Sequence, residues 1–477
     1  KVDESYRLSV SASSVHITAR TGFGVIAAST TLTQLSYREA DGSCALPAGV
    51  DIVDAPRFPW RGLLVDVSRN YFSTTQLMKI IDGMAYSKLN VLHLHATDSQ
   101  SFPLDWEFDD RKLVRVGAYK NKDGSLKVYT KRDIAQLVAH AFARGVRIVP
   151  EFDFPGHTTV WANAYPEIVM GANHVCWDGQ DDDTTACNGR WADRFCNQPP
   201  CGQINPWNER SYELISQFLS DMTAWFPSPY LGTGADEVNA NSWGLKGSPK
   251  RFQQTIQTFQ NRIAEIVKKN KRRMLVWSDS IINYGLAGTP ALPADAITIA
   301  WEIHSQAEVD TIAKVGPTVI ASYPHFYLDC GPQATWCAPF KTWETVYDYN
   351  PTAALSDVGK ANVIGGEVAM WSETIKCDVI EYAIFPRVAA AAERFWSSES
   401  TVRNADTPIR LVAWSTRATE LFNLTMSPLS WNGVLSTLYR PEWCDFNLNT
   451  PAQMGGHGVN YCEPASKYTT NDIQCSV

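Results

Sequence analysis

Residues 230–238 read YLGTGADEV, an apolar segment that passes through glycines into two adjacent acids, Asp236 and Glu237. Seven further apolar runs also end in polar, aromatic or charged residues: GLLVDVSRN (62–70), NVLHLHATD (90–98), RIVPEFDFPGH (147–157), MLVWSDS (274–280), AITIAWE (296–302), TVIASYPHFYLD (318–329) and NVIGGEVAMWSE (362–373). Buried parallel strands are near-continuous hydrophobic stretches, and a (β/α)8 barrel does its chemistry just after such strands. We therefore predict an α/β enzyme built on a (β/α)8 TIM barrel.

Helical patterns alternate with these runs. Ser73 with Gln76 and Thr130 with Asp133 are capping-box starts, and Asn205-Pro206 predicts the start of a third helix. Its apolar face would hold Tyr212, Ile215, Phe218 and Met222. Strand–helix alternation predicts a parallel sheet wound by crossover helices.

Three parts of the chain are expected from these patterns. Residues 1–55 contain strand-like segments at 6–10 and 15–18 and a helix around 24–36, which predicts the remnant of a small α+β N-terminal domain. Residues 56–400 would form the catalytic barrel. Residues 401–477 would form a C-terminal extension with a helix at about 407–422 and disulfide-braced loops.

Composition excludes several classes of function. The net charge of −8 gives no electrostatic footprint for nucleic acid or an anionic membrane, and no run reaches the roughly 20 apolar residues of a membrane span. Apolar residues make up 44% of the chain, which is enough for a large core. The 17 Trp and 18 Tyr are more than a core usually needs, and exposed rings suit the apolar face of a sugar.

Eleven cysteines, many in loop-like sequence, favour an oxidising compartment, either secreted or lysosome/vacuole-like. Those expected in disulfides, with connectivity open, are Cys176, Cys187, Cys196, Cys201, Cys330, Cys337, Cys444 and Cys462. The alternative is a zinc site, but these cysteines lack the Cys-x-x-Cys doublets of structural zinc. Asn423 begins the single glycosylation sequon. The chain opens in a strand-like segment without a start Met or signal peptide, so we expect a longer, processed precursor.

The acidic pair is the first candidate for acid–base chemistry. Gly232, Gly234 and Ala235 precede Asp236 and Glu237, so the backbone can turn tightly towards a ligand. Glycoside hydrolysis needs a proton donor and a group that stabilises positive charge at the anomeric carbon, and neighbouring carboxylates can hold their pKa values apart. The alternative is a solvated acidic pair at the start of a loop.

Histidines follow two other runs. His93 and His95 lie on one face of a strand that ends near Asp98, and His157 follows the EFDFPG turn. His-x-His spacing could bind a metal, which would make the protein a metal-dependent amidohydrolase. Such an enzyme would need further histidines after the later strands, where this chain has Trp277 and Trp301. The remaining interpretations are interior structural histidines and support of a catalytic acid, for which His157 is the best placed.

Three tryptophans, Trp277, Trp301 and Trp371, each lie at or near the end of a different run. Together they would form an apolar box sized for a small group such as a methyl, although any one alone would usually be a core residue. Polar residues near run ends could bind sugar hydroxyls or form structural ion pairs: Arg61, Asp329 and Glu373.

These clusters together resemble glycoside hydrolase family 20, the β-N-acetylhexosaminidases. The matching stretches are WRGLLVDVSRNYF (60–72), LHLHATDSQSFP (92–103), PEFDFPGHT (150–158), GADEV (234–238), YLD (327–329) and GGEVAMWSE (365–373). The resemblance covers about residues 57–400. It also extends to DESYRL (3–8) and TLTQL (31–35), which look like the tail of the family's small N-terminal domain.

The resemblance implies an exo-β-N-acetylhexosaminidase that removes terminal non-reducing GlcNAc or GalNAc, with no metal or organic cofactor. In such enzymes the acetamido oxygen of the substrate is the nucleophile and the intermediate is an oxazolinium. Glu237 matches the general acid and later base, and Asp236 matches the group that accepts the acetamido N–H. The other matches are Tyr327 to the acetamido oxygen, Trp277, Trp301 and Trp371 to its methyl, Arg61, Asp329 and Glu373 to sugar hydroxyls, and Asp98 with His157 to a relay that tunes the acid.

Two departures from the family pattern lie beside the acids: Ala235 replaces a frequent Gly, and Gly232 replaces a common His. The methyl of Ala235 is tolerated unless its backbone needs positive φ. The expected partners are β-linked N-acetylhexosamine oligosaccharides or glycoconjugates. A homodimer and a cleaved N-terminal propeptide or chain are compatible with the resemblance. A catalytically silent sugar-binding protein is the other alternative, although such a protein has no use for a proton donor.

Overall fold

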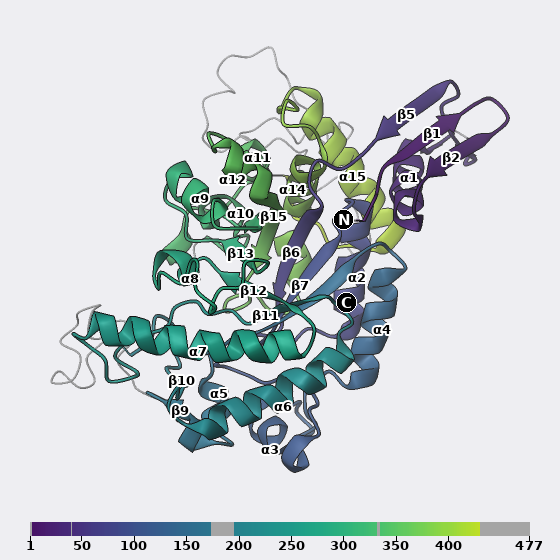
Figure 1. Ribbon diagram of the computed structural model, residues 1–477. Coiled ribbons are helices and arrows are strands. Elements are labelled where there is room, and N and C mark those ends of the chain that lie inside the picture. Colours follow the sequence, from purple (N-terminus) through teal and green to yellow (C-terminus); the bar gives the residue numbers. More distant parts are fainter. Residues whose placement is uncertain (1, 40, 173–194, 332–333, 430–477) are drawn as a thin grey trace, which may run out of the picture.

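The computed structural model of the chain describes residues 2–39, 41–172, 195–331 and 334–429. Its centre is a closed barrel of eight parallel strands in the order β11-β12-β13-β14-β15-β6-β7-β8 (Figure 1). The strands are β6 (Trp60–Asp66), β7 (Val91–Thr97), β8 (Arg147–Phe152), β11 (Tyr230–Gly232), β12 (Arg273–Trp277), β13 (Ile297–Ala300), β14 (Thr318–Ile320) and β15 (Val363–Met370). Each lies within or overlaps one of the eight apolar runs, so the predicted (β/α)8 barrel is confirmed.

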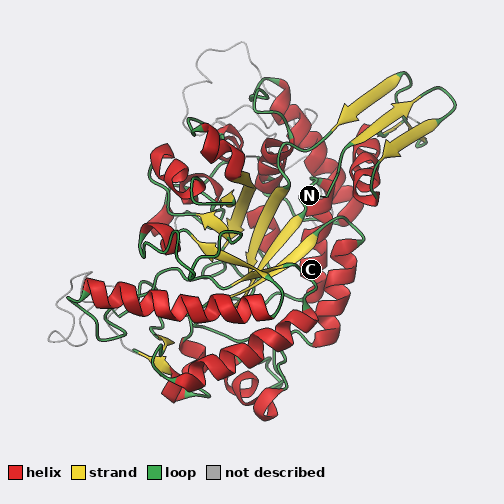
Figure 2. Ribbon diagram, in the orientation of Figure 1, coloured by secondary structure: helices red, strands yellow, loops and turns green. Residues whose placement is uncertain are grey.

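Helices surround the barrel on its outer side (Figure 2). The longer ones are α2 (Thr74–Tyr86), α3 (Phe108–Gly117), α4 (Lys131–Phe142), α6 (Glu209–Trp225), α7 (Pro249–Lys269), α9 (Gln306–Ala313), α14 (Arg387–Trp396) and α15 (Asp406–Phe422). Shorter helices are α5 (Thr159–Ala162), α8 (Asp279–Ile282), α10 (Tyr323–Phe326), α11 (Trp343–Asp348), α12 (Asp357–Asn362) and α13 (Ile380–Ile384). Short strands β9 (Val169–Met170) and β10 (Gln203–Ile204) pair in a loop outside the barrel.

The local helix signals are largely confirmed. Both capping boxes are present, at Ser73 and at Thr130, where each side chain accepts a backbone N–H and the partner three residues later reaches back. The third helix starts at Glu209 and not at Asn205-Pro206, so that prediction is wrong by three residues. The reason is local: the Asn205 side chain accepts Trp207 N and forms a turn, and Asn208 caps the helix instead.

Successive residues of a barrel strand face opposite sides. On β12, Leu275 and Trp277 join the apolar cluster inside the barrel, whereas Val276 joins the larger cluster between barrel and helices. On β7, Leu92 and Leu94 face the helices, so His93 and His95 point into the barrel. The period of two therefore places both histidines in the interior, where they are fully buried.

A small N-terminal unit lies beside the barrel (Figure 1). Strands β1 (Tyr6–Val10), β2 (Val15–Ala19) and β5 (Val50–Asp54) form an antiparallel sheet in the order β2-β1-β5, and α1 (Gly22–Leu35) packs on it. A second pair joins β3 (Tyr37–Arg38) to β4 (Cys44–Ala45). The expected small α+β unit is present, while the division at residues 55 and 400 stays a prediction.

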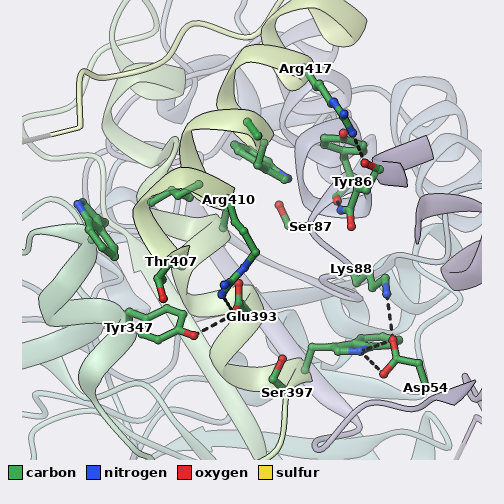
Figure 3. Close-up of a pocket in the computed structure, with 18 residues that line it drawn as sticks. Asp54, Tyr86, Ser87, Lys88, Tyr347, Glu393, Ser397, Thr407, Arg410 and Arg417 are labelled. Carbon is green, nitrogen blue, oxygen red and sulfur yellow. Dashed lines mark hydrogen bonds and ion pairs between the residues drawn. The ribbon is translucent and has the colours of Figure 1, made fainter. Parts of the chain in front are cut away.

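A cavity of about 430 Å³ lies where this unit meets α14 and α15 (Figure 3). Asp54 at its edge accepts hydrogen bonds from Lys88 at 3.2 Å and from the Trp396 indole at 2.9 Å, and Arg410 pairs with Glu393 (Figure 3). These contacts attach the N-terminal unit and α15 to the barrel. None of the residues lining this cavity was predicted to belong to the functional site.

Two of the expected disulfides lie in described residues, Cys196–Cys201 and Cys330–Cys337. Cys44 and Cys377 are exposed free thiols. The predictions for Cys176, Cys187, Cys444 and Cys462 fall outside the described residues. Within the part of the chain that the structure describes, none of the helices has both the length and the apolar character needed to cross a bilayer.

Candidate active site

The acidic pair follows β11 at the carboxyl end of the barrel, in a tightly turned backbone. The backbone φ angles of Gly234, Ala235 and Glu237 are 65°, 68° and 50°. Residues other than glycine rarely adopt this left-handed conformation. Two side chains hold the turn: Asp153 accepts Ala235 N at 3.2 Å, and Asp279 accepts Glu237 N at 3.3 Å. Ala235 would be unfavourable here only if its backbone needed positive φ, and the structure shows that it does. The alanine therefore strains this turn more than glycine would. Such strain is typical of functional sites.

His157 lies between the two acids and Asp98. Its Nε2 is 3.4 Å from Oε2 of Glu237 and 3.6 Å from Oδ2 of Asp236, and its Nδ1 is 3.3 Å from Oδ1 of Asp98. Burial opposes the charged imidazole, but Asp98 and the acidic pair outweigh it, so the pKa of His157 is raised well above its ordinary value. The sequence expectation that Asp98, His157 and the acids come together is met in the geometry.

Asp236 is a buried carboxyl whose charge is disfavoured. Burial raises its pKa to about 7, nearby His157 opposes the rise, and Asp279 and Glu237 add to it. Asp98 behaves oppositely: burial favours its neutral form, but Arg69 and His157 outweigh burial and lower its pKa. The pKa values of these two carboxyls are therefore shifted in opposite directions.

A chain of alternating imidazoles and carboxylates runs from His157 into the barrel interior. Asp98 Oδ2 lies 2.8 Å from His95 Nε2. On the other side of that ring, His95 Nδ1 lies 2.7 Å from Glu151 Oε1. The second oxygen of Glu151, Oε2, lies 3.3 Å from His93 Nε2. His93 Nδ1 faces Glu367 at 2.7 Å, and Glu367 accepts the Trp60 indole N–H at 3.0 Å. Every ring nitrogen of these histidines therefore faces a carboxylate.

The pKa values in this chain favour its charged forms. Burial lowers the pKa values of His93 and His95, but their carboxylate partners dominate and raise them to about 10 and about 9. Burial raises that of Glu151, but the two histidines dominate and lower it to about 2. Buried charges persist only when they are paired in this way.

Aromatic side chains form a buried cluster near the acids. Trp277 and Trp371 have ring centroids 5.8 Å apart, and Tyr327 lies 6.3 Å from both Trp371 and Trp301. Trp301 donates its indole N–H to Asp279 at 2.7 Å, so the residue that holds Glu237 also fixes this ring. The three tryptophans at or just past the ends of separate strands are thus brought together with Tyr327.

Asp329 and Glu373 lie at the same end of the barrel. Asp329 Oδ1 is buried and has no hydrogen-bond partner among the described residues. Burial raises the pKa of Asp329 well above its ordinary value, and the Glu373 charge adds to this effect. An orphaned buried carboxyl oxygen is costly unless a ligand supplies its partner.

Arg61 does not lie at the site, and that expectation is wrong. It is the second residue of β6, at the amino end of the barrel, where its guanidinium is 2.6 Å from Glu4 and donates to Phe58 O at 2.7 Å. It is buried beneath the N-terminal unit, with 1% of its surface exposed. The arginine at the carboxyl end is Arg69, three residues past β6, which lies 2.9 Å from Asp98 and 4.0 Å from Glu373.

The sequence reasoning missed Arg69, Asp153 and Asp279 as site residues. Each stands inside a run that had been recognised, in DVSRN, EFDFPG and WSDS. The available signal was position: each follows the last residue of a strand by one to three places. Counting from the strand ends would have selected Arg69 over Arg61.

Several of the same residues carry atoms that could bind a metal ion. Among the described residues, the site holds two groups of possible oxygen and nitrogen ligands, and within each group the ligand atoms lie within 4.8 Å of one another. One group is His95, Asp98 and Asp153, and the other is Asp153, His157 and Asp236. His93 belongs to neither, because Glu151 separates it from His95. The His-x-His pair therefore does not converge on one metal position.

Comparison with known proteins agrees with this architecture. A family model described as "Glycosyl hydrolase family 20, catalytic domain" matches residues 58–399, and one described as "beta-acetyl hexosaminidase like" matches residues 1–35. The chain is 30% identical to a β-hexosaminidase of Emericella nidulans over 490 residues, covering 93% of this chain and 76% of the relative.

It is 31% identical to a chitooligosaccharidolytic β-N-acetylglucosaminidase of Ostrinia furnacalis, covering 93% of this chain and 74% of the relative. The solved structure of a Flavobacterium johnsoniae chitobiase is similar with a TM-score of 0.72 and 28% identity, covering 89% of this chain. This chain spans 60% of the length of that chitobiase.

Proposed function

The chain belongs to glycosyl hydrolase family 20, and on that premise we propose that it is a glycosidase that removes terminal non-reducing β-linked N-acetylhexosamine. It is an exo-β-N-acetylhexosaminidase that releases GlcNAc, and we extend the proposal to GalNAc. The observation that carries it is that His157 Nε2 lies within 3.6 Å of a carboxyl oxygen of both Asp236 and Glu237. The aromatic cluster of Trp277, Trp301, Trp371 and Tyr327 lies nearby.

The proposed first step breaks the glycosidic bond. The acetamido oxygen of the substrate attacks the anomeric carbon, and Glu237 gives its proton to the leaving oxygen. The sugar becomes a cyclic oxazolinium. Glu237, now a carboxylate, next takes a proton from water as that water attacks the same carbon from the side that the aglycone left. The ring reopens, GlcNAc leaves with retained configuration, and Glu237 is protonated again.

Asp236 would accept the acetamido N–H and stabilise the positive charge that develops on the oxazolinium. Tyr327 would donate its hydroxyl hydrogen to the acetamido oxygen and aim that oxygen at the anomeric carbon. The indoles of Trp277, Trp301 and Trp371 would enclose the acetamido methyl. This division of work suits two adjacent acids, because consecutive Cα atoms are only about 3.8 Å apart and cannot flank a sugar from opposite faces.

The hydroxyl groups of the sugar would bind Asp329, Glu373 and Arg69, with Arg69 in the place first expected for Arg61. Two of these groups can accept further hydrogen bonds. Asp329 Oδ1 lacks a partner among the described residues, and the side chain of Glu373 is 30% exposed. Asp98 and His157 would hold the acid and tune its proton affinity through the 3.4 Å contact to Glu237.

Domain division, compartment and partners are part of the same proposal. We propose a remnant N-terminal domain over residues 1–55, a catalytic barrel over 56–400 and an extension over 401–477. A secreted or lysosome/vacuole-like location is supported by the disulfides Cys196–Cys201 and Cys330–Cys337. The substrates would be oligosaccharides or glycoconjugates that end in β-linked N-acetylhexosamine.

Paired chromogenic glycosides test the function. The 4-nitrophenyl β-glycoside of GlcNAc should be hydrolysed, and that of glucose should not, because only the former carries the internal nucleophile. Equal rates on both, or a trapped covalent sugar–carboxylate adduct, would overturn the mechanism. A chelator that abolished activity would support the metal-dependent amidohydrolase alternative, and GlcNAc binding without hydrolysis would indicate a silent sugar-binding protein.

A further inference from the structure

A disulfide-closed loop covers the edge of the candidate active site. Residues 195–203 include the Cys196–Cys201 bridge and are fastened to the barrel by backbone carbonyls. Pro199 O accepts from Gln100 at 3.0 Å, and Pro200 O accepts from Thr159 at 2.7 Å. The loop residues also border a small space next to His157 and Glu237. The loop therefore has a defined position at the carboxyl end of the barrel.

Gln198 on this loop reaches into the group of residues assigned to the sugar hydroxyls. Its Oε1 accepts from Arg69 Nη2 at 2.5 Å, and its Nε2 donates to Glu373 Oε1 at 2.8 Å. Only one orientation of the amide satisfies both neighbours, because a guanidinium can only donate and a carboxylate can only accept. A sugar hydroxyl offers the same pair of functions, one accepting lone pair and one donating hydrogen.

Gln198 and a sugar hydroxyl cannot both accept a hydrogen bond from Arg69 Nη2 at the same time. That nitrogen has two hydrogens. Gln198 Oε1 accepts one of them at 2.5 Å, and on its other side Nη2 faces Asp98 Oδ2 at 2.9 Å and His157 Nδ1 at 3.3 Å. Asp98 is fully buried and also bonds His95 and His157, so it stays in place. A sugar hydroxyl can therefore reach Arg69 Nη2 only after Gln198 has withdrawn.

We propose that Gln198 is a positioning residue that stands in for sugar hydroxyls before substrate binds, holding Arg69 and Glu373 in place until the substrate displaces it. The proposal rests on the proposed function, since it needs Arg69 and Glu373 to bind the sugar. Breaking the hydrogen bonds of Gln198 to Arg69 and Glu373 costs free energy, which reduces the net free energy of substrate binding. The apparent dissociation constant is then the intrinsic one divided by the fraction of open protein.

The test compares Gln198→Ala with wild type and with Asn197→Ala. Asn197 lies on the same loop, and neither Arg69 nor Glu373 forms a hydrogen bond with its side chain. One net hydrogen bond shifts an equilibrium by about fivefold. Gln198→Ala should thus lower KM for 4-nitrophenyl β-GlcNAc and the Ki of free GlcNAc by about fivefold, with kcat within twofold. Asn197→Ala should match wild type in all three.

A rise or no change in KM and Ki for Gln198→Ala would overturn the proposal, as would an equal change in Asn197→Ala. A Gln198→Met variant, which keeps the side-chain volume but has no hydrogen-bonding amide, should behave like Gln198→Ala. In a crystal structure with GlcNAc, Gln198 should no longer bridge Arg69 and Glu373; a retained bridge would also overturn it. If wild type neither hydrolyses the glycoside nor binds GlcNAc, the proposed function fails instead.

Discussion

A Cβ atom added to Gly234 would lie 1.8 Å from Oδ1 of Asp153. The glycine before the acidic pair is therefore required twice, by its φ of +65° and by the close approach of a carboxyl that holds the turn. Asp153 is itself buried, and burial and the Asp236 charge raise its pKa well above the ordinary value. The position of Asp236 and Glu237 thus depends on the absence of one methyl group.

Gly234→Ala should lower both stability and activity. Gly244 is the matched control, because its φ is +64° but an added Cβ would meet nothing within 4 Å. Gly244→Ala should cost about 1–2 kcal/mol from the left-handed backbone alone, and Gly234→Ala about 1–3 kcal/mol more from overpacking. Urea unfolding and kcat measure both effects. Equal destabilisation in the two variants would show that the clash with Asp153 is relieved at no cost.

Glu237→Gln removes the proposed proton donor and keeps the shape of the side chain. We expect kcat for a β-GlcNAc glycoside to fall by about 10²- to 10⁴-fold, which is the usual size of general acid–base contributions. The melting temperature should change little, because the Glu237 side chain is 25% exposed. Near-normal turnover in this variant would be incompatible with the assignment of Glu237.

Asp236→Asn should lower activity and raise stability near neutral pH. Activity on 2-acetamido substrates should fall by about 10²- to 10³-fold, because charge stabilisation of the intermediate is lost. The folded-state pKa of Asp236, about 7, exceeds its ordinary value of 3.8, so the folded protein binds this proton more tightly than the unfolded chain does. Ionisation therefore lowers the free energy of unfolding as pH rises from about 4 to 7.

Asparagine avoids that loss, so the variant should gain stability over wild type at pH 7.5 and much less at pH 4. Each unit of pKa shift corresponds to about 1.4 kcal/mol, which sets the upper scale of the gain. Denaturant unfolding at the two pH values measures it. A variant that is less stable than wild type at pH 7.5 would contradict the expected cost of burying this charge.

Glu151→Gln tests the chain of imidazoles and carboxylates. At pH 6.5 the variant leaves His93 and His95 charged with one carboxylate fewer, and we expect a loss of about 3–5 kcal/mol in unfolding free energy. The raised pKa values of the two histidines stabilise the fold below about pH 6.5, and this stabilisation disappears as pH rises through about 9 and 10.

The effect of Glu151→Gln should therefore shrink at pH 10, where His95 is mostly neutral and His93 is about half neutral. Asp51→Asn is the control, since it breaks an exposed pair with Arg7 and should change the unfolding free energy little at either pH. Urea unfolding at pH 6.5 and 10 gives the comparison. A loss that is the same at both pH values would mean that charge pairing is not what holds Glu151.

Arg69→Lys and Arg61→Lys test which of the two arginines binds the sugar. Arg69→Lys should raise KM for a β-GlcNAc glycoside by about tenfold or more, because lysine cannot reproduce the fork of donors. Arg61→Lys should lower stability by about 1–3 kcal/mol through its contacts with Glu4 and Phe58 and leave KM within twofold. The opposite assignment of the two effects would restore Arg61 to the site.

The barrel could be predicted from the sequence because its physical cause is local. A strand covered on both faces must be apolar along its whole length, and β6 and β7 are buried at every residue. The acidic pair, His157 and the tryptophans were found because the carboxyl ends of parallel strands meet at one edge, whatever the exact packing. The helix caps were also local, as at Ser73 and Thr130.

The amino-acid sequence by itself thus determined the barrel, and it pointed to the end of the barrel and the acid–base residues that we propose carry the chemistry. Only the tertiary structure decided which arginine lies at the candidate site, because Arg61 near the start of β6 and Arg69 just past its end lie at opposite ends of the barrel. It also decided the pairing of His93 with Glu151 and Glu367, and the placing of Gln198 beside Arg69. Such contacts join residues up to hundreds of positions apart, and hydrophobic periodicity carries no information about which polar groups meet across the interior.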